Sequence, residues 1–124
     1  WLMELDAAIV RAGLAQRFAE LYSLFGLSND AAWLVSDQFR PELTRFGTLF
    51  QVIDTCKADR RAIRPMCRNL GWPAAVVKSR GRLAAGEIQK WLEKKPDGMA
   101  LETLLVGTGP GETSFAVAAR RFSE

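Results

Sequence analysis

The chain has 124 residues, of which 48% are hydrophobic and 25% charged, with a net charge of +3. This length and composition fit one folded domain spanning residues 1–124 and exclude an intrinsically disordered protein. Two cysteines and the absence of histidine argue against a disulfide framework or a metal site and exclude Ser-His-Asp or Cys-His catalysis. No apolar run approaches the ~20 residues that cross a bilayer, so we expect a cytoplasmic protein. The missing histidine removes the commonest general base, so we also expect that the protein is not an enzyme. We expect no cofactor.

The first part of the chain, residues 1–56, carries four basic and seven acidic side chains. Apolar residues recur mainly at three- and four-residue steps, which predicts helices over 1–25 and 42–61. Ser28 can cap another helix, which we expect over 28–39. Apolar residues also lie off the main stripe of the first helix, so that helix is either buried in the core or used for self-association. We therefore expect residues 1–56 to form a helical core or to join two copies into a homodimer.

The middle part, residues 57–95, holds eleven basic and three acidic side chains, a net charge of +8. Charge of this density attracts polyanions, with nucleic acid first and an anionic membrane surface second. Prolines that can begin a helix and glycines that can end one predict a short helix from Pro65 to Gly71 and another from Pro73 to Gly81. A further helix is expected over 86–95, where Trp91 packs with other apolar residues.

One motif lies inside this basic part, from Met66 to Lys78. Cys67 is the small residue that would let two helices cross, Gly71 permits a left-handed turn, and Trp72 is one of the apolar residues that would lock the corner. The segment resembles the helix-turn-helix cassette of bacterial DNA-binding regulators over about twenty residues. Cysteine stands where alanine is usual, and Arg80 stands where an apolar anchor is common.

The resemblance implies that the helix after Pro73 enters the major groove of duplex DNA. Its outward residues offer only Lys78 as a strong donor to base edges, so most affinity would come from arginines that contact phosphates. The DNA-binding residues predicted in this way are Arg60, Arg61, Arg64, Arg68, Ala74, Ala75, Lys78, Ser79, Arg80 and Arg82.

The residue pattern changes in the last part of the chain, residues 96–124, from helix-like to strand-like. Strand-compatible runs at 101–106 and 113–118 flank a glycine-rich loop, which predicts a β-hairpin. A helix-turn-helix followed by a hairpin resembles a winged helix. The loop also looks like a phosphate-binding loop, but Glu112 stands where that loop needs lysine.

The sequence thus predicts a mostly α fold: a helical domain with a helix-turn-helix cassette and a C-terminal, winged-helix-like β-hairpin. The predicted function is DNA binding in transcription regulation or in plasmid, phage or chromosome maintenance. The structural alternative is an ordinary turn between helices. The functional alternatives are a protein interaction adaptor whose basic face docks an acidic partner, and an anionic-membrane role. Trp33, Trp72 and Trp91 are expected in the core or an interface, and Cys56 and Cys67 as small buried residues.

Overall fold

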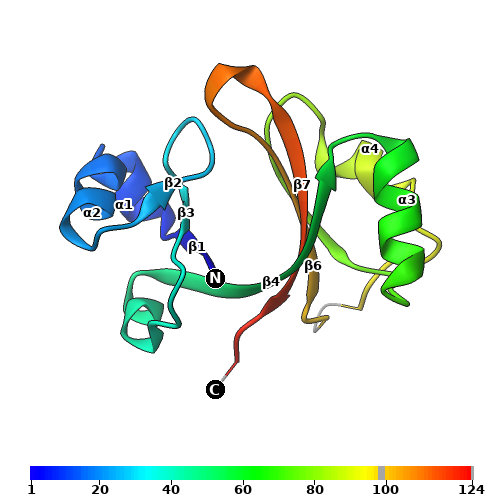
Figure 1. The fold of residues 1–124 in the computed structure, drawn as a ribbon, viewed down its shortest axis with the longest axis horizontal. Helices are drawn as coiled ribbons and strands as arrows, with labels where there is room; N and C mark the ends of the chain where they lie inside the picture. Colours follow the sequence, from blue (N-terminus) through cyan, green and yellow to red (C-terminus); the bar gives the residue numbers. More distant parts are fainter. Residues whose placement is uncertain (98–99, 124) are drawn as a thin grey trace. The chain divides into compact units, whose positions relative to one another are not determined.

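A computed structural model describes residues 1–97 and 100–123 of the chain (Figure 1). The chain divides into two compact units, the first comprising residues 1–51 and 122–124 and the second residues 52–121. No helix in the described ranges is long and apolar enough to cross a membrane. The prediction of one domain with parts at 1–56, 57–95 and 96–124 stays a prediction.

The first unit is built on strand β1, which lies between two antiparallel neighbours. β1 pairs with β3 on one side and with the beginning of β4 on the other, and β3 pairs with the short strand β2. Leucine, methionine and phenylalanine side chains from these strands and from α2 form its core. The elements are β1 (Leu2–Leu5), α1 (Ala7–Arg11), α2 (Ala15–Leu21), β2 (Phe25–Gly26), β3 (Trp33–Val35), the 3-10 helix η1 (Pro41–Arg45) and β4 (Gly47–Lys57).

The predicted helix over 1–25 is therefore wrong, and with it the structural basis for a homodimer through N-terminal helices. Residues 2–5 form a strand that is buried almost throughout, and a strand buried on both faces lacks the polar alternation that separates it from a helix. Gly13, at φ +73°, then divides the helical remainder into α1 and α2.

The predicted helix over 28–39 is also wrong, because Ser28 organises a turn instead of capping a helix. Its hydroxyl donates to Asp30 at 2.7 Å and accepts from the backbone N–H of Trp33 at 3.1 Å. The turn leads into β3, where Trp33 is fully buried, as expected. The Trp33 indole N–H donates to the Glu4 carboxylate on β1 at 2.7 Å.

The predicted helix over 42–61 is replaced by η1 and β4. Gly47 begins β4 opposite Leu5, and the position that a Cβ would take on Gly47 lies 2.0 Å from the Glu4 carbonyl oxygen. Glycine at this point lets β1 and β4 approach closely. The segment forms a strand because it pairs with β1, which is distant in the sequence.

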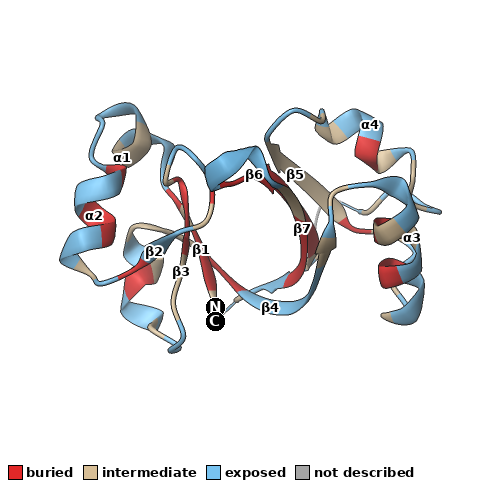
Figure 2. Ribbon diagram, turned by 45° about the horizontal axis from the view of Figure 1, so that its top comes forward, coloured by how far each residue is buried: buried red, intermediate tan, exposed pale blue. Residues whose placement is uncertain are grey.

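The second unit places two helices on one face of a sheet with the order β4-β7-β6-β5 (Figure 1). Buried residues of α3 and α4 pack against alternate residues of β6 and β7, and Figure 2 shows the buried positions of both helices. The elements after β4 are α3 (Arg60–Asn69), β5 (Val76–Arg80), α4 (Ala85–Gln89), β6 (Glu102–Thr108), the 3-10 helix η2 (Pro110–Glu112) and β7 (Ser114–Arg121).

The helix-turn-helix is wrong because its second helix is strand β5. Gly71 does adopt the left-handed conformation, at φ +69°, but Val76 and Val77 then enter a parallel ladder with β6, opposite Thr103 and Leu104. Two adjacent β-branched residues favour a strand once a neighbouring strand offers its hydrogen bonds. Pro65, expected to start a helix, lies inside α3.

The predicted strands near the C-terminus do form an antiparallel hairpin, with Glu102 opposite Arg120 at one end and Thr108 opposite Ser114 at the other. The hairpin is part of the sheet rather than a wing beside a recognition helix. The predicted helix over 86–95 is present only as the shorter α4. The fold is therefore mixed α/β, and the mostly α, winged-helix-like class is wrong.

Candidate functional site

A cavity of about 190 Å³ lies in the second unit, between the end of α3 and the segment that follows α4. Two tryptophans and two arginines line it together with a carboxylate. The lining residues are Arg64, Cys67, Arg68, Gly71, Trp72, Pro73, Trp91, Leu92 and Glu93.

Local sequence signals fix the elements around this cavity. Asp59 caps α3 by accepting a hydrogen bond from the Ala62 N–H at 2.8 Å, which satisfies one of the free donors of a helix N-terminus. At the other end, the left-handed Gly71 reverses the chain, and the Trp72 N–H donates to the Cys67 carbonyl at 2.8 Å. This hydrogen bond holds the backbone of Trp72 against the last turn of α3.

The far wall is the segment after α4. The Trp91 N–H donates to the Ile88 carbonyl at 2.9 Å, and the Lys94 N–H donates to the Pro73 carbonyl at 2.9 Å. The second bond ties this segment to the turn that carries Trp72. Both indoles are half-buried, so the two aromatic residues are supported by backbone hydrogen bonds and remain accessible.

The charges in the cavity do not cancel. The Arg68 guanidinium and the Glu93 carboxylate form an ion pair, with Nε and Oε1 3.6 Å apart. Arg64 is one helical turn before Arg68, so both side chains project from the same face of α3. Within the described ranges, Arg64 has no ion pair or side-chain hydrogen bond. The lining thus keeps one uncompensated positive charge.

Cys67 contributes an apolar part of the lining. It is buried, and burial raises the pKa of its thiol above the ordinary value. The neutral thiol is therefore the stable form at physiological pH, as expected for a small buried residue. Cys56 is half-buried, and burial is the largest cause that raises the pKa of its thiol to about 11.

The structure separates the predicted DNA-binding residues into different environments. The four arginines from 60 to 68 are on α3, but Ala75 is fully buried in the core. Lys78, Ser79 and Arg80 lie on β5, where the Ser79 hydroxyl donates to the Leu83 carbonyl. Ala74 is half-buried in the turn before β5, and Arg82 pairs with Glu112. Only Arg64 and Arg68 of this set reach the cavity.

Sequence reasoning assigned Trp72 and Trp91 to the core or an interface and gave no role to Glu93. Their shared position depends on the sheet that carries β5, since the chain between them passes through that strand. One signal was present: Trp72-Pro73 directly follows the left-handed glycine inside the most basic part of the chain.

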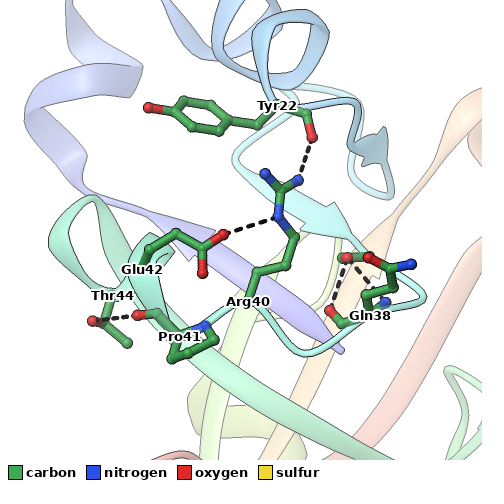
Figure 3. A network of polar contacts seen from close by, with 7 residues as sticks. Tyr22, Gln38, Arg40, Pro41, Glu42 and Thr44 are labelled. Carbon is green, nitrogen blue, oxygen red and sulfur yellow. Dashed lines mark hydrogen bonds and ion pairs between the residues drawn. The ribbon is translucent and has the colours of Figure 1, made fainter.

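A cluster of polar residues in the first unit forms hydrogen bonds and an ion pair among its own members (Figure 3). The Arg40 guanidinium donates to the carbonyl of Tyr22, the C-cap residue that follows α2, and pairs with Glu42 at 3.2 Å. The Arg40 Cζ atom also lies 5.7 Å from the centroid of the Tyr22 ring. This cluster connects the end of α2 to η1, and we interpret it as structural.

The chain resembles known proteins both in sequence and in structure, whereas no family model matches it. The chain is 31% identical over 81 residues to uncharacterized S-adenosylmethionine-dependent methyltransferases from two strains of Mycobacterium tuberculosis, CDC 1551 and H37Rv. The match covers 65% of this chain and 22% of each relative. A crystal structure of a candidate methyltransferase from Porphyromonas gingivalis W83 superposes with a TM-score of 0.79 at 19% identity, over 98% of this chain and 29% of that one.

These matches overturn the predicted function. A DNA-binding, helix-turn-helix regulator of transcription is contradicted, as is duplex DNA as the main partner. The adaptor alternative is not supported. The prediction that the chain is not part of an enzyme is contradicted as well. The basic segment that suggested DNA is real, but its turn joins a helix to a strand.

Proposed function

We propose that this chain is part of an S-adenosylmethionine-dependent methyltransferase, in which it binds the substrate rather than the methyl donor. The observation that supports methyl transfer is the 31% identity over 81 residues to proteins of that name. The match spans 22% of their length, so the activity of the complete protein is part of the proposal. A cytoplasmic location also stays a prediction.

The sheet supports a role apart from the methyl donor. Nucleotide cofactors bind doubly wound sheets at the carboxyl ends of parallel strands. Here the pairings of β1 with β3 and β4, of β2 with β3, and of β6 with β7 are antiparallel, and β5 with β6 is parallel. The fold therefore differs from the doubly wound arrangement.

The cavity chemistry does not fit S-adenosylmethionine either. The methyl donor carries a sulfonium cation, which the uncompensated charge of Arg64 would repel. We therefore derive no step of methyl transfer from these residues and assign the cavity to the substrate side.

Isothermal titration calorimetry with S-adenosylmethionine tests both parts of the proposal. The complete protein that carries this sequence should bind the methyl donor and transfer its tritiated methyl group, whereas the 124-residue chain should show no binding heat. A folded complete protein that does not bind the methyl donor would contradict the methyltransferase assignment. Binding by the 124-residue chain would instead contradict the substrate-side role.

A further inference from the structure

The cavity between α3 and the segment after α4 combines aromatic rings with a positive charge. Trp72 and Trp91 present half-buried indoles, and Arg64 presents a guanidinium without a partner in the described ranges. The remaining charged residues, Arg68 and Glu93, form an ion pair. A ligand that fits this lining has a planar ring system and a negative charge.

The size of the cavity limits the kind of ligand further. A cavity of about 190 Å³ is smaller than the sites of drug-sized ligands, so it suits one ring system rather than several. Aromatic side chains stack on any nucleobase because every base has a π face, and a nearby cation attracts the attached phosphate. Bases in a duplex already stack on each other, so the ligand has an unpaired base.

The positive charge excludes the other common ligand of tryptophan-lined sites. Aromatic cages that bind quaternary ammonium groups depend on attraction between a cation and ring faces. Here the guanidinium of Arg64 would repel such a cation, and Glu93 is engaged by Arg68. An anion is favoured instead.

We propose that this cavity binds the base of one nucleoside monophosphate unit against Trp72 and Trp91, with the phosphate of the same unit at Arg64. The unit is either a free mononucleotide or a nucleotide of a single strand. This inference deepens the proposed function, since it names the substrate chemistry of the same cavity. Arg64 and Trp72 are then substrate-binding residues.

Calorimetry and tryptophan fluorescence on the 124-residue chain test the inference without measuring methyl transfer. The probes are AMP, UMP, ribose 5-phosphate, adenosine, S-adenosylmethionine and a five-residue single-stranded oligoadenylate. AMP or the oligoadenylate should bind more tightly than ribose 5-phosphate and adenosine, because only the nucleotides use both the rings and the arginine. Binding of AMP would show that a free nucleotide is a sufficient ligand. Binding of the oligoadenylate without binding of AMP would show that the ligand is a nucleotide within a single strand.

Variants locate the binding. Trp72→Leu should weaken nucleotide binding roughly 5- to 150-fold, which is the range of one stacked base, and Arg64→Gln should weaken it about tenfold or more. Arg61→Gln is the matched control, because Arg61 is an exposed arginine of the same helix outside the lining, and it should change affinity less than twofold. Circular dichroism checks folding, and Trp72→Phe should retain most binding if a ring is what matters.

Three results would overturn the inference. One is the absence of binding by AMP, UMP and the oligoadenylate at millimolar concentration; the second is equal affinity for ribose 5-phosphate and AMP, which describes a simple anion site. The third is equal loss in Arg64→Gln and Arg61→Gln. If nucleotides bind as proposed while the complete protein transfers no methyl group, the methyltransferase assignment fails and this inference stands.

Discussion

Replacing Gly47 by alanine tests the close approach of β1 and β4 in the first unit. A Cβ on residue 47 would lie 2.0 Å from the Glu4 carbonyl oxygen and 2.9 Å from the Glu4 carbonyl carbon, against ordinary contacts of 3.4 Å or more. The obstructing atoms are backbone, so no side-chain rotation relieves the clash. The strands must move apart by about 1.4 Å at this point.

The energetic cost follows from that displacement. Overpacking typically costs ~1–3 kcal/mol, and stretching one or two ladder hydrogen bonds adds ~0.5–1.5 kcal/mol each. We expect Gly47→Ala to lower the free energy of unfolding by about 2–5 kcal/mol, a large part of the ~5–15 kcal/mol of a typical domain. The melting temperature should fall by roughly 10 °C or more.

Gly86→Ala is the matched control, because it adds the same methyl group inside α4 with no atom within 4 Å. It should raise the free energy of unfolding by ~0.5–1 kcal/mol, since alanine is the better helix former. Urea denaturation followed by circular dichroism measures both variants. A Gly47→Ala protein within 0.5 kcal/mol of the original chain would refute the register of β1 and β4.

Two further predictions concern titratable groups. The hydrogen bond from Arg120 to Glu102, at 2.8 Å across β6 and β7, is the main cause that lowers the pKa of Glu102 from 4.5. Its stabilisation is therefore present above pH 4.5 and lost as the pH falls through the lower folded-state pKa. Glu102→Gln should cost ~0.2–1 kcal/mol at pH 7, and this cost should shrink as the pH is lowered below 4.5. A cost in urea titrations that does not change with pH would contradict the pairing. For Cys56, whose thiol pKa is raised to about 11 chiefly by burial, we expect iodoacetamide to react slowly at pH 8 and its rate to keep rising beyond pH 9 by mass spectrometry, whereas a rate that levels off near pH 8.5 would show an unperturbed thiol.

The sequence by itself determined the features that depend on neighbouring residues. The left-handed backbone of Gly71 and the end of the preceding helix were predictable, because glycine tolerates positive φ without steric cost. The C-terminal hairpin was also predictable, since strand-compatible runs flank a glycine-rich loop. The concentration of positive charge between residues 57 and 95 was visible directly.

Only the tertiary structure decided which apolar segments became strands. Residues 2–5 and 47–57 have apolar spacing that a helix also satisfies. They are strands because β1 forms hydrogen bonds with β3 on one side and with β4 on the other. Val76 and Val77 became part of β5 because β6, more than twenty residues later, offered a parallel ladder. Hydrogen-bond pairing between distant segments thus outweighed the local helix periodicity of this segment. Because the expected recognition helix is a strand, Trp72 and Trp91 lie at the same cavity.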